Sequence, residues 1–255
     1  MNLALVQPDI RWEQPDANLK HYDSMIDSIH KGCDLILLPE MFTTGFTMRS
    51  QVFCLPNENH VVEWMKTHSD NLDAAISGSL IVQEREGIYN RLYFVEPEGK
   101  ISIYDKRHLF RMGGEGEHYR AGTEKLVVSF RGWRICPLIC YDLRFPVWSR
   151  NREDYDLLLY TANWPAVRTD VWNTLLKARA IENQSWVAGI NRVGRDGEGI
   201  EYIGETQVID PKGKIILKMD DREEVGYAEL SLEELQNFRK KFPVWKDRDS
   251  FNLFQ

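Results

Sequence analysis

The chain has 255 residues, of which 43% are hydrophobic and 28% are charged, proportions typical of a globular protein. Its formal net charge of −7 argues against a protein that binds nucleic acid through a basic surface. No apolar run approaches the length of a membrane span, and the first residues lack the charged start and long apolar stretch of a secretory signal. We therefore expect a cytoplasmic protein with one domain over residues 1–255, in which residues 245–255 form a C-terminal tail.

Short apolar strands alternate with amphipathic segments along the whole chain. Runs of hydrophobic residues bounded by turn-forming residues predict strands over 3–6, 35–38, 75–82, 90–95, 101–104, 126–130, 133–139, 157–160, 186–190, 204–209, 214–217 and 227–230. Helical spacing predicts helices over 19–29, 61–65, 169–184 and 231–242, the last beginning with a Ser231–Glu234 capping box. In the helix over 169–184 we expect Val171, Leu175, Ala178 and Ile181 to lie on one face. So many strands suit two packed sheets covered by helices better than one open sheet.

Three predicted strands end in residues that carry chemistry. The strand over 133–139 ends at Cys140, and Glu40 and Lys106 follow two other apolar strands. Taken singly, each has an ordinary explanation, namely a buried thiol in the core or a charged residue in a solvated loop. Ligand sites in α/β sheets gather at the carboxyl ends of strands, so we expect these three side chains to meet.

Glu, Lys and Cys together are suited to acyl transfer from an amide. The segment after Cys140 has the pattern of a helix start, and the positive end of its dipole is expected to favour the thiolate. Glu40 can take the thiol proton and pass it to the departing nitrogen, and then activate a water to hydrolyse the thioester. Lys106 and the backbone N–H of Tyr141 are expected to stabilise the oxyanion.

The sequence around these residues resembles the nitrilase superfamily of carbon–nitrogen hydrolases. Glu40 lies in LPEMF, Lys106 in YDKRHLF and Cys140 in CYDLRFP, like the Glu-Lys-Cys triad of that superfamily. Further similarity comes from 162–165, 178–183, 204–206 and 209–213. The phrases KRHLFRM, CYDLRFPVWSRN and ARAIENQ are most similar to the ω-amidase branch.

This resemblance implies an α/β fold, a four-layer α-β-β-α sandwich of two packed mixed sheets flanked by helices. It also implies hydrolysis of the terminal amide of 2-oxoglutaramate or 2-oxosuccinamate to the 2-oxo acid and ammonia. No metal and no cofactor are expected. The implied partners are a small-molecule amide substrate and a second copy of the chain in a homodimer, paired through the segment after Pro146 and the helix over 169–184. A nitrile or N-carbamoyl substrate, or a binding protein without turnover, stays open.

Many members of the superfamily use a second glutamate, and the resemblance selects Glu115, with Glu117 as the alternative. Arg144, four residues after the cysteine, is expected to bind the substrate carboxylate through a bidentate pair, or else to form a structural salt bridge with Asp142. We expect His108 to be structural, because the order of the charged residues suits a glutamate-based triad better than a Cys–His pair. The aromatic residues predicted to wall the pocket are Phe42, Phe46, Tyr141 and Trp164.

The remaining cysteines and the long loops complete the prediction. Cys33, Cys54 and Cys136 show no metal-binding spacing and are expected to be reduced thiols. The irregular segments over 43–59 and 111–123 are expected to flank the site as lids. Trp245, Phe251 and Phe254 in the tail are expected to pack on a neighbouring subunit or on their own chain.

Overall fold

The structure, a computed structural model, describes residues 1–152 and 154–253. Two mixed sheets make up the centre of the molecule. The seven-stranded sheet has the order β15 (Glu224–Glu229), β1 (Asn2–Gln7), β2 (Leu35–Leu37), β4 (Ala75–Glu84), β5 (Gly87–Val95), β6 (Ile101–Asp105), with β3 (Leu55–Pro56) paired to β4. The six-stranded sheet has the order β14 (Ile215–Lys218), β13 (Gln207–Ile209), β10 (Trp186–Ile190), β9 (Leu157–Thr161), β8 (Trp133–Ile139), β7 (Val128–Phe130).

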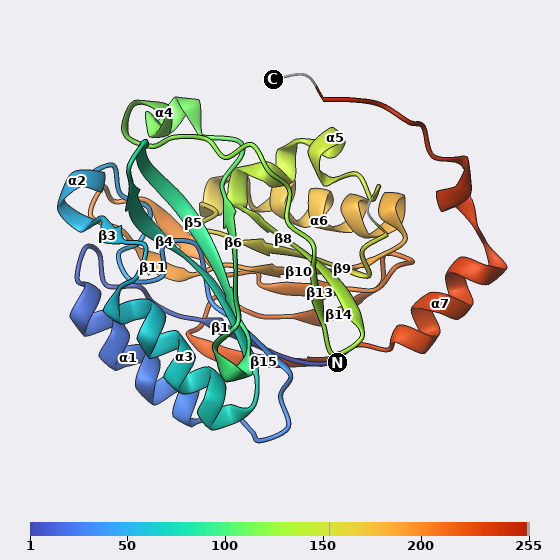
Figure 1. The fold of residues 1–255 in the computed structure, drawn as a ribbon, viewed down its shortest axis with the longest axis horizontal. Coiled ribbons are helices and arrows are strands. Elements are labelled where there is room, and N and C mark those ends of the chain that lie inside the picture. The colour runs from blue at the N-terminus through green and yellow to red at the C-terminus, as the bar shows by residue number, and fades with distance from the viewer. Residues whose placement is uncertain (153, 254–255) are drawn as a thin grey trace.

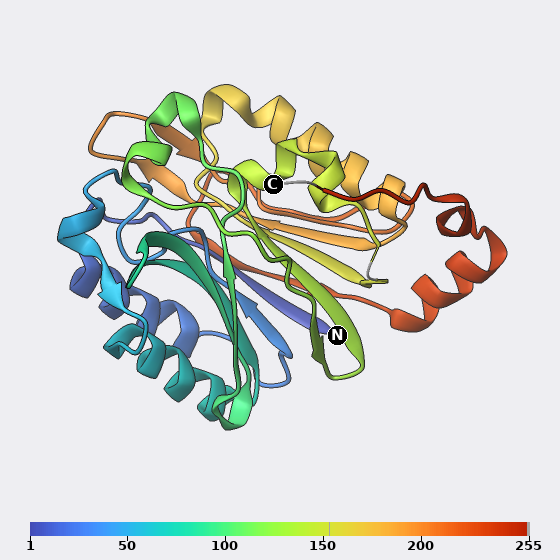
Figure 2. The ribbon, with the colours of Figure 1, turned by 45° about the horizontal axis from the view of Figure 1, so that its top comes forward.

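Helices cover the outer face of each sheet (Figures 1 and 2). α1 (Pro15–Asp27) and α3 (His60–Leu72) lie side by side on the seven-stranded sheet, and α6 (Thr169–Asn183) lies on the six-stranded sheet. The shorter helices are α2 (Ser50–Phe53), α4 (Glu115–His118), α5 (Pro146–Ser149) and α7 (Leu232–Lys241). The predicted four-layer α-β-β-α sandwich is therefore confirmed.

The alternation of side chains along the central strands explains these layers. Leu3 and Leu5 of β1 belong to the core between the two sheets, whereas Ala4 and Val6 pack under the helices α1 and α3. Successive residues of a strand point to opposite faces, so a strand buried on both faces reads as a continuous apolar run. This arrangement places the carboxyl ends of β2, β6 and β8 at one edge of the sandwich.

The buried face of α6 is not the apolar face formed by Val171, Leu175, Ala178 and Ile181. Trp172, Leu176 and Ala180 are fully buried, whereas Ile181 is 49% exposed, and Val171, Leu175 and Ala178 are only partly buried. The helix is rotated by about one residue because the large Trp172 side chain fills the space below β10 and the buried Arg179 donates to the carbonyl of Leu143. A search for apolar residues at helical spacing treats Arg179 as polar and therefore does not identify the buried face of α6.

Several turns and short elements were not predicted. A separate hairpin of β11 (Val193–Arg195) and β12 (Glu201–Ile203) follows β10. The predicted strand over 204–209 begins only at Gln207, because Gly204 and Glu205 both have positive φ. Among the described residues, no helix combines the length and the apolar character needed to cross a membrane.

The C-terminal part of the chain, through α7 and the turn η5 (Val244–Asp247), contacts its own chain. Ser231 caps α7 as predicted, since its hydroxyl accepts the N–H of Glu234 at 3.1 Å. Arg248 donates to the carbonyl of Asn151 at 2.9 Å. Phe251 lies under the guanidinium of Arg152, 4.8 Å from the ring centroid, while Phe254 lies outside the described residues.

Candidate active site

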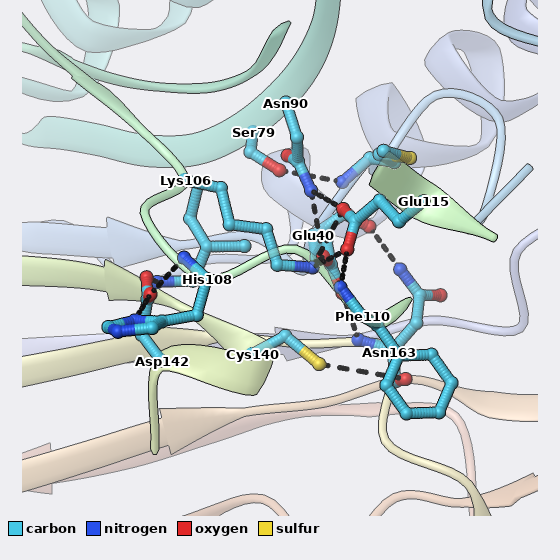
Figure 3. A network of polar contacts seen from close by, with 12 residues as sticks. Glu40, Ser79, Asn90, Lys106, His108, Phe110, Glu115, Cys140, Asp142 and Asn163 are labelled. Carbon is cyan, nitrogen blue, oxygen red and sulfur yellow. Dashed lines mark hydrogen bonds and ion pairs between the residues drawn. The ribbon is translucent and has the colours of Figure 1, made fainter. Parts of the chain in front are cut away.

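The three residues predicted from the strand ends lie together. Glu40 follows β2 and Lys106 follows β6, both in the seven-stranded sheet, whereas Cys140 follows β8 in the six-stranded sheet. Figure 3 shows Lys106 reaching toward Glu40, with Cys140 close by. The Lys106 Nζ donates to Glu40 Oε1 at 2.8 Å, and the two side chains are 1% and 0% exposed. The site therefore lies at the interface between the sheets.

Glu115, the first residue of α4, completes the ion-pair cluster. Its two carboxylate oxygens each lie 2.9 Å from Lys106 Nζ, and Oε2 also accepts the backbone N–H of Phe110 at 2.5 Å. Glu117 stands on the same short helix but is exposed to solvent. The geometry thus places Glu115, rather than Glu117, beside the lysine.

Two asparagines that the sequence analysis did not select hold Glu40 in place. Asn90 of β5 donates to Glu40 Oε1 at 2.8 Å. The backbone N–H of Asn163 donates to Glu40 Oε2 at 3.0 Å, and its side-chain amide donates to the Glu40 carbonyl at 2.5 Å. A usable signal existed at Asn163, which follows the apolar strand β9 just as Glu40 follows β2. Buried amides of this kind require partners.

Cys140 and the residue after Glu40 have an unusual backbone conformation. Cys140 has φ of +41° and Met41 has φ of +43°, both in the left-handed region that residues with a side chain rarely adopt. Each costs about 1–2 kcal/mol, and such strain is concentrated at functional sites. The turn η3 (Cys140–Arg144) begins at the cysteine and presents the thiol to the cavity, where Sγ lies 3.9 Å from the carbonyl of Asn163.

The electrostatics of Cys140 differ from the prediction. Burial and the Glu40 carboxylate raise the pKa of the Cys140 thiol well above its ordinary value, although Lys106 acts in the opposite direction. A turn of five residues has too small a dipole to offset this desolvation. The resting thiol is therefore protonated.

The pKa values of the other buried groups reflect their mutual pairing. Burial alone would lower the pKa of Lys106, but the carboxylates of Glu115 and Glu40 raise it well above its ordinary value, so the ammonium persists. Burial raises the pKa of Glu115, Lys106 lowers it, and Glu40 raises it, with a net increase. The cluster therefore holds one cation between two carboxylates.

A cavity of about 660 Å³ opens above these residues. Its wall includes Phe46, Tyr141, Trp164 and Arg144. The Arg144 guanidinium lies over the Trp164 ring, 5.5 Å from its centroid, and forms no ion pair with any described residue. The alternative salt bridge with Asp142 is absent, because four other donors occupy that carboxylate.

The prediction for Phe42 was wrong. Phe42 is fully buried and does not line the cavity. Its backbone N–H donates to Ser79 of β4, and its ring packs edge-on against Tyr22 of α1 with 5.4 Å between the centroids. Phe46 takes the place expected for it, with its ring 5.1 Å from Lys106 Nζ.

The two long segments predicted as lids are joined at the cavity rim. The Tyr119 hydroxyl donates to the carbonyl of Thr47 at 2.6 Å, and the Ser50 hydroxyl donates to the carbonyl of His118 at 3.2 Å. The hairpin β11–β12, which was not predicted, adds Tyr202 to the wall, and the turn η4 (Ala166–Arg168) adds a second arginine, Arg168.

Comparison with known proteins agrees with this geometry. Residues 2–240 match the family model described as carbon-nitrogen hydrolase. The chain belongs to the carbon–nitrogen hydrolase family. It is a hydrolase acting on carbon–nitrogen bonds other than peptide bonds. It is 50% identical to the omega-amidase YafV of Escherichia coli (strain K12) over 100% of this chain and 99% of that protein.

Two further relatives extend the comparison. The chain is 33% identical to the 2-oxoglutaramate amidase of Bacillus subtilis (strain 168), over 96% of each protein. Among solved structures, XC1258 from Xanthomonas campestris, a CN-hydrolase superfamily protein with an arsenic adduct in its active site, has a TM-score of 0.98 and 42% identity. That match covers 100% of this chain and 99% of XC1258.

Proposed function

We propose that this hydrolase cleaves the terminal amide of short 2-oxo dicarboxylic acid monoamides, such as 2-oxoglutaramate and 2-oxosuccinamate, to the 2-oxo acid and ammonia. The observation that carries the proposal is the buried cluster in which Lys106 joins Glu40 and Glu115 beside Cys140. The similarity to enzymes named omega-amidase and 2-oxoglutaramate amidase supports the substrate class.

In the first half-reaction, the substrate acylates Cys140. The Glu40 carboxylate accepts the thiol proton as Sγ attacks the amide carbon, because the resting thiol is protonated. The carbonyl oxygen becomes an oxyanion, stabilised by the Lys106 ammonium and the backbone N–H of Tyr141. Glu40 then returns the proton to the amide nitrogen, the C–N bond breaks, and ammonia leaves as a thioester forms on Cys140.

In the second half-reaction, water hydrolyses the thioester. Glu40 accepts a proton from the water as its oxygen attacks the thioester carbon, and the same oxyanion contacts operate again. The C–S bond breaks, the 2-oxo acid leaves, and the proton passes to the Cys140 sulfur. Glu115 keeps Lys106 charged and oriented through both steps, since both of its oxygens contact Nζ at 2.9 Å.

The substrate carboxylate needs a cationic partner away from the reacting amide. We assign this role to Arg144, which lines the cavity and forms no ion pair with another described residue. A planar guanidinium can bind a carboxylate through two parallel hydrogen bonds. Stacking on Trp164 holds the guanidinium in place, with 5.5 Å between Cζ and the ring centroid.

Ammonia release tests the substrate assignment. 2-Oxoglutaramate is assayed beside glutamine, an aliphatic nitrile and an N-carbamoyl amino acid, with Cys140→Ala as the control. We expect turnover of the 2-oxo amide that disappears in the variant. Activity on the nitrile or the N-carbamoyl compound alone would overturn the substrate class. No turnover of any compound would support a binding protein without catalysis.

We further propose that the protein is a homodimer in the cytoplasm. Ile181 of α6 and Val147 of α5 are each 49% exposed, so both elements predicted to pair present apolar side chains to solvent. Cys33, Cys54 and Cys140 are free thiols, which agrees with a reducing compartment. Light scattering after gel filtration tests the dimer, and Ile181→Glu should shift the mass toward the monomer. An unchanged mass would exclude this face.

A further inference from the structure

Asp142 is a buried carboxylate beside the site that the reaction steps above do not use. It is 0% exposed and lies two residues after Cys140, at the six-stranded sheet. Its two oxygens accept hydrogen bonds from four donors in two separate segments of the chain. A buried carboxylate with this many partners is strongly fixed in position.

Three of these donors flank Lys106. The Tyr104 hydroxyl, two residues before the lysine, donates to Asp142 Oδ2 at 2.7 Å. The backbone N–H and the ring Nδ1 of His108, two residues after the lysine, lie 3.0 Å and 2.8 Å from Oδ1. Figure 3 shows His108 beside Asp142, close to both Lys106 and Cys140. Asp142 therefore holds the Tyr104 side chain before Lys106 and both the backbone and the ring of His108 after it.

The fourth donor flanks the cysteine. The backbone N–H of Ile139, at the end of β8, donates to Asp142 Oδ2 at 3.0 Å. Cys140 lies between Ile139 and Asp142, so the same carboxylate that holds the Lys106 segment also closes the turn that presents the thiol. One side chain thus connects the end of β6 in one sheet to the end of β8 in the other.

This connection matters because the ion pairs of the site do not provide it. Glu40 follows β2 and Glu115 contacts the segment after β6, so their pairing with Lys106 organises the side of the seven-stranded sheet alone. Cys140 belongs to the other sheet. Its position relative to the lysine depends on contacts that cross the interface, such as those of Asp142 and of Asn163 with Glu40.

The donors around Asp142 are themselves held in place. The Trp148 Nε1 donates to the Tyr104 hydroxyl at 3.0 Å. The His108 ring is stacked on Phe145, with 3.7 Å between centroids and 5° between planes. Trp148 and Phe145 both lie on the segment that follows Cys140, so the two segments are locked together by hydrogen bonds and by packing.

We propose that Asp142 is a positioning residue that fixes Lys106 against Cys140 across the interface between the two sheets. It acts through Tyr104 and His108 on either side of Lys106 and through Ile139 before Cys140, and it does not touch the substrate. This inference rests on the role of Cys140 as nucleophile in the proposed function. A misplacement of about 1 Å in a catalytic group can lower the rate on the order of 10²-fold.

Two variants test this role. Asp142→Asn keeps the shape but exchanges an acceptor for a donor. Tyr104→Phe leaves the carboxylate in place but removes the hydroxyl that donates to it and that accepts from Trp148 and the backbone N–H of Arg107. We expect Asp142→Asn to lower kcat on the order of 10²-fold and Tyr104→Phe about tenfold, with KM within about twofold of wild type. If Asp142→Asn does not fold, the Tyr104→Phe variant decides the question alone.

The pKa of the Cys140 thiol provides a second readout that needs no substrate. Lys106 lowers this pKa in the native site, so a displaced lysine should raise it further. The rate of alkylation by iodoacetamide, measured against pH, reports the thiol pKa, with Cys140→Ala correcting for the other thiols. We expect the alkylation profile of both variants to move to higher pH.

Asp156→Asn is the matched control. Asp156 is also a buried carboxylate, but it accepts from Arg134 N at 3.0 Å and Arg239 Nη1 at 2.8 Å, away from the site. The Asp156→Asn variant should have a lower free energy of unfolding, while its kcat and its alkylation profile stay unchanged. If the Asp142 and Tyr104 variants behave in the same way, the positioning role is refuted. If the wild type has no ω-amidase activity, the proposed function fails while the alkylation comparison still tests this inference.

Discussion

Replacing Glu115 by Gln removes one charge from the centre of the site at nearly constant volume. Lys106 Nζ lies 2.9 Å from both Glu115 oxygens, and both side chains are buried. With an effective dielectric constant of about 20, two unit charges at this distance attract by about 6 kcal/mol. Part of this attraction is offset by desolvation of the pair, and Lys106 keeps its contact with Glu40. Removing one partner of a buried ion pair nevertheless costs about 3–5 kcal/mol, because it leaves the other charge less well compensated.

We therefore expect a loss of about 3–4 kcal/mol in transition-state stabilisation, which corresponds to roughly 10²–10³-fold in kcat. The pH profile should change as well. Because the folded-state pKa of Glu115 is raised, the wild-type rate should fall at low pH with an apparent pKa above about 4.3, the ordinary value of a glutamate. Removing this group should move the acid limb to lower pH.

The assay is ammonia release from 2-oxoglutaramate between pH 4 and 9, with Glu117→Gln as the matched control. Glu117 lies on the same helix but is exposed, so its replacement should leave kcat and the pH profile unchanged. A Glu115→Gln variant with wild-type kcat, or a Glu117→Gln variant with the larger loss, would refute the assignment.

The cavity and its charges lead to three further predictions. Arg144→Gln should raise KM for 2-oxoglutaramate by about 10–100-fold and leave a neutral aliphatic amide unaffected; equal effects on both substrates would exclude carboxylate binding. Lys106→Arg should lose at least about 10²-fold in kcat, because a planar guanidinium does not replace a compact ammonium between two carboxylates; near-normal turnover would remove Lys106 from the site. Glu115 should contribute most to the free energy of unfolding below the ordinary glutamate pKa, and this contribution should decrease as the pH rises through its raised folded-state pKa. Urea unfolding of the wild type and of Glu115→Gln at several pH values measures the change.

The three charged or nucleophilic residues at strand ends could be predicted because each follows a recognisable strand pattern. Apolar runs precede Glu40 and Cys140, and the alternating segment Ile101–Tyr104 precedes Lys106. Glu40, Lys106 and Cys140 stand where β2, β6 and β8 end, and parallel and antiparallel strands in packed sheets bring such ends to one edge. Residues that act through a backbone amide or a buried side-chain amide leave no comparable pattern. Asn90, inside β5, was missed for this reason, whereas Asn163 follows β9 and could have been selected by the same strand-end pattern.

Backbone conformation and helix rotation explain the other differences between the prediction from sequence and the structure. The positive φ of Met41 and the packing of the loop after it direct Phe42 under α1, and nothing in the local sequence distinguishes this ring from that of Phe46. On α6, the size of Trp172 and the buried hydrogen bond of Arg179 determine which face of the helix is buried, and the apolar spacing of the sequence does not show this. The high pKa of Cys140 depends on burial and on Glu40, which a helix-start pattern does not reveal.

The acyl-enzyme on Cys140 tests the central claim most directly. The protein is mixed with 2-oxoglutaramate, quenched in acid within the first turnovers, and analysed by mass spectrometry while the released ammonia is measured. The proposed mechanism predicts that the 2-oxo acid is joined through its terminal carbonyl, as a thioester, to the peptide that contains Cys140. It also predicts one ammonia for each adduct in the first turnover, and neither product in Cys140→Ala. Ammonia production by Cys140→Ala at the wild-type rate, without an adduct, would contradict it.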